Sequence, residues 1–578
     1  MDSLHLATLH SSPELSQEEV VHSLARECAF PVPADSVTVR QTHISIVFLG
    51  GDLAYKVKKP VKLPFLDFST VQRRHFFCEE EVWINRPWAP DVYLGVVPVT
   101  HESGGLQFEG NGPMVDWAVK MRRLPESATL KSRLQCGTLE PQDIVQTAQR
   151  IAAIHRQAHH CVGEQAAEAQ AEFRCQMRQN WDFARGLTPD VIDPQILQRI
   201  EWLSDEWLKR HDDTLRRRPG DGCIRELHGD LRLEHIFLFP ERTPPRDILI
   251  IDGIEFDSAL RRIDVVADMA FLVMELGFAG RRDLAQVFAD AYFEATGDNS
   301  GGSLLPLFAA YRSAVRAKVA AILSAELQDV SGVSEASDEH RENLMPEGSG
   351  HHFQQSQRDE ALARSRAHWL WCLSELEAPD RRPALVLVSG LPGTGKSTLA
   401  RTLSEAACFD EVIRSDVVRK ELFPSTATMD DTAILYSAER VERTYDECWT
   451  RARRRLLSGG RVIVDATFHR ESVRRRFLQL AIDCGTRAVW LECTAPADIV
   501  QTRLEARHGD PSDADWPVYQ VVREQWEHAS EFSKRFHATI DASEHAADAL
   551  NEARDVLRLQ GLIGGSVDQT LRDKSRCV

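Results

Sequence analysis

The chain has 578 residues, of which 43% are hydrophobic and 27% are charged, and its formal net charge at pH 7 is −18. A chain of this length is too long for a single hydrophobic core, so we expect a globular protein of two or more domains. The acidic balance argues against a general affinity for nucleic acid or for an anionic membrane, because such binding depends on basic surface.

The sequence contains no evident targeting or membrane segment. Its start has neither a basic run nor an apolar run, and its most apolar stretch, 265–279, is too short to span a bilayer. The twelve cysteines are scattered without a CxxC pair, which is typical of reduced thiols rather than of a disulfide framework. These observations predict a cytoplasmic protein without a membrane partner.

The N-terminal part begins with a predicted β-hairpin. Apolar residues at 44–49 and 53–57 flank a Gly-Gly turn. From about Asp143 onward the apolar residues recur mainly at helical spacing, except in a strand–loop–strand segment at about 224–252. A sheet-rich start and a helical remainder predict two lobes with a cleft between them.

Two acidic motifs lie in the strand–loop–strand segment. His228-Gly229-Asp230 follows the first strand, and Asp252-Gly253-Ile254-Glu255 follows the apolar run at 248–251. Phosphoryl transfer needs a carboxylate that orients the attacking hydroxyl and a metal ion that bridges the phosphates. The two motifs resemble those of the aminoglycoside phosphotransferase and choline kinase branch of the protein-kinase-like fold. The plain alternative is an ordinary turn followed by a solvated strand end.

The resemblance implies a role for each carboxylate. Asp230 would be the catalytic base and Asp252 the magnesium ligand, with Glu255 as a possible second carboxylate. The family has an asparagine five residues after the catalytic aspartate, whereas this chain has His235. A neutral imidazole is a poor ligand for a hard cation. The N-terminal lobes would therefore use one metal ion, use Glu255 instead, or bind nucleotide with little turnover.

The resemblance also implies further parts of the site. Lys56, on the second strand of the hairpin, would pair with the inner phosphates and be held by Glu81, and Lys58 is the competing lysine. Asp264 and Asp268 resemble the aspartates that brace the catalytic loop of the family. The histidines at 155, 159–160 and 351–352 have no obvious carboxylate partners, so we expect them on the surface or in a linker.

A change in composition divides the chain. Residues 328–360 are polar, acidic and poor in large apolar side chains, which predicts a linker. A helix at about 357–376 then leads to the next domain. The predicted domains are therefore 1–327 and 361–578, with 328–360 between them.

The C-terminal domain opens with a phosphate-binding motif. The apolar run 384–388 leads into Gly390-Leu391-Pro392-Gly393-Thr394-Gly395-Lys396-Ser397-Thr398, which continues as a predicted helix. Backbone N–H groups of such a turn converge on phosphates, and glycine allows the main chain to come close. Lys396 would reach the outer phosphates, and the Ser397 hydroxyl would complete a magnesium site. This region is predicted to bind ATP with Mg²⁺.

Three further clusters follow this motif. The strand 461–465 ends in Asp465, which suits a water-mediated contact to magnesium, and Asp416 precedes Arg419 by three residues. Arg503 and Arg507 lie on one predicted helix. The set resembles small P-loop kinases, namely gluconate kinase, adenylylsulfate kinase and the kinase module of polynucleotide kinase. A helix-start carboxylate with solvated arginines is the plain alternative.

The resemblance implies that Asp416 is the base and that Arg419 contacts the acceptor or the transferred phosphate. Arg503 or Arg507 would be the lid arginine that neutralises charge developing on the phosphates. As a whole the chain resembles bacterial fusions of an aminoglycoside-phosphotransferase-like domain with a zeta-toxin-like or gluconate-kinase-like, AAA-type ATP-binding domain. The expected fold is an α+β, protein-kinase-like bilobal domain followed by an α/β P-loop kinase domain with a doubly wound parallel sheet.

This reading predicts a bifunctional phosphotransferase that moves the γ-phosphate of ATP to hydroxyl groups of small molecules. Two alternatives remain. In one, a degenerate N-terminal lobe senses nucleotide and regulates the P-loop kinase. In the other, the protein is a nucleic-acid end-processing kinase, which the charge of −18 makes unlikely because gripping a polyanion calls for a basic channel. The sequence predicts neither the acceptor nor the oligomeric state.

Overall fold

The computed structural model describes residues 16–32, 35–63, 66–334, 349–424, 437–506 and 514–565. The chain forms two compact units that alternate along the sequence. The first comprises Met1–Phe173, Thr214–Leu276 and Asp283–Gly302, and the second comprises Arg174–Asp213, Gly277–Arg282 and Ser303–Val578. The predicted domain boundaries at 327 and 361 stay a prediction.

The first unit is built on a six-stranded antiparallel sheet in the order β1-β2-β3-β8-β6-β7. Its strands are β1 (Val37–Gln41), β2 (Ser45–Gly50), β3 (Leu53–Lys58), β6 (Tyr93–Glu102), β7 (Gly105–Phe108) and β8 (Met114–Arg122). The predicted hairpin is present as β2–β3, in which Gly50 pairs with Leu53 and the turn residue Gly51 has a φ of 54°.

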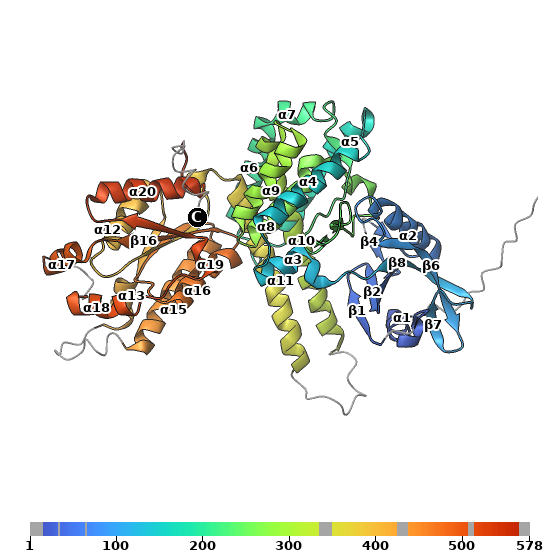
Figure 1. Cartoon of the computed structure of the whole chain (residues 1–578), viewed down its shortest axis with the longest axis horizontal. Coiled ribbons are helices and arrows are strands. Elements are labelled where there is room, and N and C mark those ends of the chain that lie inside the picture. The colour runs from blue at the N-terminus through green and yellow to red at the C-terminus, as the bar shows by residue number, and fades with distance from the viewer. Residues whose placement is uncertain are drawn as a thin grey trace, which may run out of the picture. The chain divides into compact units, whose positions relative to one another are not determined.

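The two faces of this sheet have different partners because successive side chains of a strand point to opposite faces. One face packs against helix α2 (Val71–Asn85), as Figure 1 shows, and its core includes Ala54, Val82 and Val119. The other face packs against α1 (Gln17–Leu24). Lys56 and Lys58 stand on the same face as Ala54, so both side chains point toward α2.

The rest of the N-terminal half is mainly helical, with short strand pairs between the helices. The helices are α3 (Leu130–Cys136), α4 (Pro141–Gln157), α5 (Glu164–Arg185), α7 (Asp212–Arg217), α8 (Val265–Phe278) and α9 (Arg282–Thr296). The short strands are β4 (Lys62–Leu63) with β5 (Leu66–Asp67), β9 (Ile224–Glu226) with β12 (Arg262–Asp264), and β10 (Ile236–Leu238) with β11 (Ile248–Ile250). The predicted strand–loop–strand segment therefore contains β9, β10 and β11. Short 3₁₀ turns are Glu27–Ala29, Glu126–Ala128, Ser258–Leu260, Gly301–Leu304 and Pro379–Arg381.

The second unit contains a five-stranded, wholly parallel sheet in the order β14-β15-β13-β16-β17. The strands are β13 (Ala384–Ser389), β14 (Glu411–Arg414), β15 (Arg461–Asp465), β16 (Arg487–Thr494) and β17 (His537–Asp541). The chain leaves β13 toward β14 and β15, and later passes to β16 on the other side. This is the predicted doubly wound topology, in which ligands bind at the carboxyl ends of the strands where the strand order reverses.

Helices cover both faces of the parallel sheet (Figure 1). Helices α12 (Lys396–Ala406) and α20 (Ala546–Leu559) pack on one face. Helices α13 (Ser415–Leu422), α15 (Ala438–Leu457) and α16 (Glu471–Asp483) pack on the other. Three short helices complete this part: α17 (Ala497–Glu505), α18 (Trp516–Glu524) and α19 (Glu531–Lys534). The strands read as continuous apolar runs because both of their faces are buried.

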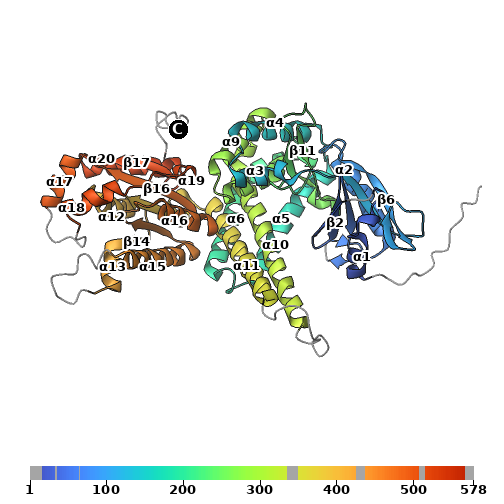
Figure 2. The same ribbon diagram turned by 60° about the horizontal axis from the view of Figure 1, so that its bottom comes forward.

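Three longer helices also belong to the second unit: α6 (Pro194–Arg210), α10 (Leu305–Ser334) and α11 (Ser349–Leu376). Figure 2 shows α10 and α11 packed side by side. The predicted helix at 357–376 is present but begins at Ser349, and residues 328–334 are also helical. Most of the predicted linker is therefore not an irregular segment, and its middle, 335–348, lies outside the described residues. In the described ranges, no helix has the length and apolar content that a bilayer-crossing helix would need.

The amino end of the parallel sheet is fastened by one buried side chain, Arg461 at the start of β15. Its guanidinium donates to the carbonyl oxygens of Pro379 and Arg382 at 3.0 and 2.9 Å. It also donates to those of Ala407 and Leu562 at 3.1 and 2.9 Å. These carbonyls follow α12 and α20 or precede β13, so one side chain joins the ends of both helices to the central strand.

We predict that Arg461→Met destabilises the protein by about 3 kcal/mol, because two buried and two part-buried carbonyl groups lose their donor. The exposed neighbour Arg381 offers a matched control, and Arg381→Met should change stability by less than about 0.5 kcal/mol. Urea unfolding of full-length protein measures both values. Equal, small losses in the two variants would contradict the assigned role.

Candidate active sites

The turn between β13 and α12 is a main-chain cradle whose glycines cannot be replaced without strain. Gly390, Gly393 and Gly395 have φ values of 144°, 82° and 95°, which L side chains rarely adopt. A Cβ at Gly390 would lie 2.5 Å from the carbonyl oxygen of Cys493, and one at Gly393 would lie 2.9 Å from Val500. The close approach of β16 and α17 therefore requires glycine here, as does the backbone conformation.

Helix α12 begins immediately after the cradle. Gly395 occupies its N-cap position, so the first backbone N–H groups of the helix have no acceptor within the helix and can bind an anion. The cradle is held by the Thr394 hydroxyl, which donates to the Leu391 carbonyl at 2.8 Å, and by the Gly390 N–H, which lies 3.4 Å from the Thr467 carbonyl. Lys396 and Ser397 follow as the first two helical residues. This arrangement suits phosphate binding.

Asp465 ends strand β15 beside the cradle. It pairs in register with Val388 of β13 and with Arg414 of β14, and it is buried. Burial raises the pKa of Asp465 above its usual range, against the opposing effects of Lys396, Ser397 and Arg414. Its Oδ1 atom is buried without a hydrogen-bond partner, which a bound cation could supply.

The residues around this oxygen fit magnesium. Mg²⁺ typically takes one or two protein oxygen ligands together with waters and substrate phosphates, and Ser397 and Asp465 supply two such oxygens. Among the residues that the structure describes, no group of three or more His, Cys, Asp and Glu side chains is placed to hold a metal ion. The two oxygens of Ser397 and Asp465 fit a metal ion that arrives with a nucleotide.

Arg414 is a site residue that the sequence analysis missed. Its Nη2 atom lies 3.5 Å from the Ser397 hydroxyl, and its Nε atom lies 3.3 Å from Oδ2 of Asp465. The guanidinium thus contacts the Ser397 hydroxyl and Oδ2 of Asp465, whereas Oδ1 of Asp465 is the oxygen without a partner. Its position at the carboxyl end of a predicted strand, just before Ser415-Asp416, was the only sequence signal for a site residue, because ligands bind at the carboxyl ends of parallel strands.

The predicted pair of Asp416 and Arg419 lies on the first two turns of α13 at the same edge of the sheet. Nη2 of Arg419 is 3.5 Å from Oδ1 of Asp416. Asp416 is close enough to contribute to the raised pKa of Asp465. Helix α13 therefore brings a carboxylate and a buried arginine toward the cradle and the end of β15.

A strained residue borders the same edge. Phe468 is fully buried with a φ of 52°, a conformation that is an outlier for a bulky side chain. Its N–H donates to the hydroxyl of Tyr445 at 3.2 Å. Burial raises the pKa of Tyr445 to about 12, against the opposing effect of this hydrogen bond. Strain of this kind persists where surrounding structure holds it, often at functional sites.

Arg503, on α17, lies over the cradle. Its Nη2 donates to the Ser543 carbonyl at 3.0 Å, and its Nη1 lies 3.9 Å from the position that a Cβ would take at Gly395. One predicted lid arginine is therefore within reach of the phosphate-binding turn. The other, Arg507, lies outside the described residues.

The first unit holds a second cluster of charges around Lys56. Its Nζ is 2.8 Å from Glu81 of α2 and 2.6 Å from Asp252. Lys58 also contacts Glu81 at 2.8 Å and forms a short ion pair with Glu255. Burial would lower the pKa of Lys56, but Asp252 and Glu81 raise it well above its usual value. Of the two competing lysines, Lys56 is the one that contacts Asp252.

Asp252 is held as a carboxylate at a strained position. Burial acts to raise its pKa, but Lys56 and then His235 hold the pKa of Asp252 well below its usual range. Its φ is 66°, and its N–H donates to the Tyr93 hydroxyl at 3.0 Å. The side chain is therefore ionised and pre-positioned, as a metal ligand must be.

The loop that carries Asp230 is braced from below by Asp268. This carboxylate accepts from the N–H groups of His228 and Gly229 at 3.2 and 2.9 Å. Asp264 instead pairs with the buried Arg218. His155, which we expected on the surface or in a linker, is buried and lies 3.2 Å from Asp268. That expectation was wrong because its partners are distant in sequence.

His235 stands between the two predicted catalytic carboxylates. Its Nδ1 is 3.0 Å from the Asp230 carbonyl and 3.6 Å from Oδ2 of Asp230. Its Nε2 is 3.6 Å from Oδ2 of Asp252. The imidazole therefore fills the space where the resemblance expects an asparagine and a second metal ion.

Comparison with known proteins finds similarity along much of the chain. Residues 385–532 match the protein family described as AAA domain. The uncharacterized proteins Rv2004c of Mycobacterium tuberculosis (strain H37Rv) and Mb2027c of Mycobacterium bovis are each 32% identical to this chain over 484 residues, which are 83% of this chain and 88% of the relative. The matched length exceeds that of either predicted domain, so the similarity includes residues of both.

Solved structures similar to this chain each cover about a third of it. A gluconokinase from Sinorhizobium meliloti 1021 is 19% identical, with 31% of this chain and 95% of that chain covered and a TM-score of 0.24. Kti12 of Chaetomium thermophilum, solved in complex with ADP-AlF3, is 17% identical, with 32% and 100% covered and a TM-score of 0.25. The sheet order, the glycine-rich cradle and the match to the AAA domain family together support a P-loop kinase-like fold in the C-terminal region.

We predict opposite effects of Asp465→Asn on stability and on nucleotide binding. The pKa of Asp465 is raised in the folded protein, so its ionised form costs stability above that pKa, and the cost disappears as pH falls through it. The amide removes this cost at pH 7, so the melting temperature should be unchanged or higher. Magnesium-dependent binding of ATP should weaken about 10- to 100-fold. Calorimetry with and without Mg²⁺ measures both, and a lower melting temperature with normal binding would contradict the assignment.

Proposed function

The chain belongs to the family that contains the mycobacterial protein Rv2004c, and we propose that its C-terminal region is an ATP-dependent kinase that transfers the γ-phosphate to a hydroxyl group of a small molecule. The observation that carries this proposal is the proximity of Asp416 to Asp465, whose pKa both Asp416 and Lys396 affect, and of Asp416 to Arg419. Nucleotide binding alone does not need a second carboxylate at that edge, whereas transfer to a hydroxyl needs a group that orients it.

The proposed mechanism follows from these positions. The cradle and Lys396 hold the β- and γ-phosphates, and Ser397 and Asp465 would hold magnesium, which neutralises phosphate charge when it is bound. Asp416 accepts a hydrogen bond from the acceptor hydroxyl and takes its proton as the new P–O bond forms. Arg419 stabilises negative charge on the transferred group. Arg503, above the cradle, has the reach to do the same from the opposite side.

The acceptor is proposed to be a small molecule rather than a nucleic acid. The chain carries a formal charge of −18, which opposes binding of a long polyanion because that binding gains its affinity from basic surface. A few arginines close to the phosphates are sufficient for a compact substrate. Transfer to oligonucleotide ends is the outcome that would favour the alternative.

We further propose that the first unit is a second ATP-dependent phosphotransferase site. It is supported by the contacts of Lys56 with Glu81 and Asp252 and by the braced loop before Asp230. In this site Lys56 pairs with the phosphates, Asp252 would hold magnesium and Asp230 orients the acceptor. His235, between the two carboxylates, leaves room for one metal ion; a site that binds nucleotide without turnover is the regulatory alternative.

For the C-terminal site we predict that Lys396→Ala lowers transfer of labelled γ-phosphate to a pool of small hydroxyl compounds by about 100-fold or more. Asp416→Asn should lower transfer about 10²- to 10⁴-fold while nucleotide binding persists. As a control, Arg401→Ala changes an exposed residue of α12, the helix that carries Lys396, and it should leave transfer unchanged. Transfer by Asp416→Asn at the normal rate would overturn the role of this aspartate, and label on oligonucleotides in place of small molecules would overturn the acceptor class.

For the first unit the test uses full-length Lys396→Ala protein, in which the C-terminal site is silenced. We predict a residual transfer that Asp230→Asn lowers about 10²- to 10⁴-fold, with nucleotide still bound. If Lys396→Ala protein binds nucleotide in the first unit but shows no residual transfer, the regulatory alternative replaces the phosphotransferase proposal. Absence of both binding and transfer would contradict either function for this unit.

A further inference from the structure

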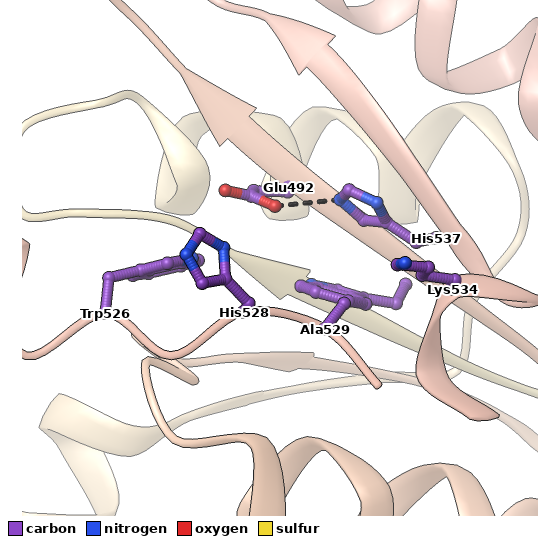
Figure 3. Close-up of a pocket in the computed structure, with 7 residues that line it drawn as sticks. Glu492, Trp526, His528, Ala529, Lys534 and His537 are labelled. Atoms are coloured by element: carbon purple, nitrogen blue, oxygen red, sulfur yellow. Dashed lines mark ion pairs between the residues drawn. The ribbon is translucent and has the colours of Figure 1, made fainter. Parts of the chain in front are cut away.

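The second unit contains a pocket with no role in the proposed transfer. It has a volume of about 440 Å³, within the range of small-molecule sites. We call it the β16–β17 pocket, and Figure 3 shows its lining. The lining residues are Trp490, Glu492, Trp526, His528, Ala529, Lys534 and His537.

The floor of the pocket is set by two neighbouring strands. Trp490 and Glu492 are two residues apart on β16, so their side chains point to the same face of the sheet. His537 is the partner of Trp490 on β17, with ring centroids 4.1 Å apart. Its Nε2 atom is 2.8 Å from a carboxylate oxygen of Glu492, the ion pair drawn in Figure 3. Regular sheet pairing therefore fixes an imidazole, an indole and a carboxylate relative to one another.

The opposite wall is a loop held by the fully buried Arg474. Its guanidinium donates to the carbonyls of Glu527 and His528 at 2.6 and 3.3 Å, and to the Glu471 carboxylate at 2.9 Å. This anchor positions Trp526 and His528 across the cavity from the Glu492–His537 pair (Figure 3). The pocket is thus formed in advance by a sheet on one side and an anchored loop on the other, as small-molecule sites usually are.

The pocket lining includes none of the residues proposed for the acceptor site, although its wall contacts the segment after β15, where the Glu527 N–H donates to the His469 carbonyl at 2.9 Å. Strands β14 and β15, which lead to Asp416 and Asp465, lie on one side of β13, and β16 lies on the other. Three strand spacings separate β14 from β16, roughly 14 Å. The pocket is also linked to the cradle by one hydrogen bond. The Trp490 indole N–H donates at 2.6 Å to the hydroxyl of Ser389, the residue before Gly390.

The lining disfavours a charged occupant. Glu492 is already paired with His537, and Lys534 at the mouth is paired with Glu531 at 2.6 Å. An anion would meet the carboxylate of Glu492, and a cation would meet the ammonium of Lys534. An occupant of either charge therefore meets one group of like charge in the lining.

The lining favours hydroxyl groups on a ring. A hydroxyl both donates and accepts, so it can donate to Glu492 and accept from a histidine or a lysine. The indole of Trp526, which is partly exposed at the wall, offers an apolar face to the C–H groups of a ring. We propose that the β16–β17 pocket binds a neutral, polyhydroxylated ring compound of monosaccharide size. This proposal does not depend on the kinase activity of either site.

The test is saturation-transfer NMR on the full-length protein with three rings of matched shape and different charge: D-glucose, D-glucuronate and D-glucosamine. A panel of further neutral sugars, D-galactose, D-mannose, D-xylose and myo-inositol, accompanies them. At about 5 mM ligand, at least one neutral ring should receive saturation. The charged analogues of glucose should bind at least about tenfold more weakly than the best neutral ring, because each meets a like charge.

Variants assign the signal to the pocket. Trp526→Ala and Glu492→Gln should each weaken binding about tenfold, and His528→Ala, at an exposed position, should weaken it less. Trp202→Ala removes an exposed tryptophan elsewhere in the unit and should have no effect. Lys396→Ala should also leave binding unchanged, because it alters the nucleotide site only. Melting temperatures establish which variants are folded; if Trp526→Ala is not, Glu492→Gln and His528→Ala decide.

Four results would overturn the proposal. They are the absence of saturation in every neutral ring, tighter binding of a charged ring, unchanged binding in the folded pocket variants, and loss of binding in Lys396→Ala. The last would move the ligand to the nucleotide or acceptor site.

Discussion

The close approach of main chain at the carboxyl end of β13 is the constraint on which the C-terminal region depends. Gly390 lies so near the carbonyl of Cys493 that no side chain fits, and the backbone has a positive φ at Gly390, Gly393 and Gly395. These conditions start α12 at this point, where its first N–H groups have no acceptor within the helix. The carboxylates of Asp416 and Asp465 lie beside that point because Asp465 ends β15 and Asp416 begins the helix that follows the neighbouring strand β14.

Charge in the first unit is organised by a different principle. Two buried lysines on one strand meet three carboxylates from α2 and from the segment after β11. Taking one lysine away would leave buried charges without partners, which is strongly destabilising. The cluster therefore fixes α2, β3 and the loop of Asp252 together. Its excess of one carboxylate leaves Asp252 facing His235, so the negative charge is concentrated where a metal ion would bind.

Contiguous signals in the sequence gave correct predictions. The turn 390–397, the hairpin β2–β3 and strand β15 follow from local patterns of glycine and apolar residues, and the doubly wound order follows from the resemblance to P-loop kinases; the structure contains all of them. The polar composition of the linker region indicated an irregular segment, but α10 continues through residues 328–334 and α11 begins at Ser349. These residues have low helix propensity, so their helical form is attributed to the packing of the two helices against each other.

Other features depend on contacts that sequence spacing does not encode. Arg414 contacts Ser397 and Asp465 because three strands end at one edge, and its local sequence shows only that it lies at the end of a strand, not which residues it contacts. Lys56 and Lys58 point the same way from β3, so only the fold distinguishes which one reaches Asp252. His155 looked like a surface residue because its partners Tyr292 and Asp268 are more than a hundred residues away along the chain.

We propose that main-chain N–H groups at 390–397 bind the phosphates of ATP. Hydrogen exchange of the full-length protein, with and without Mg²⁺ and a non-hydrolysable ATP analogue, tests this most directly. We expect the amides of this turn and of the first turn of α12 to exchange more slowly when the analogue is bound. Unchanged exchange there, at analogue concentrations that saturate the protein, would contradict it.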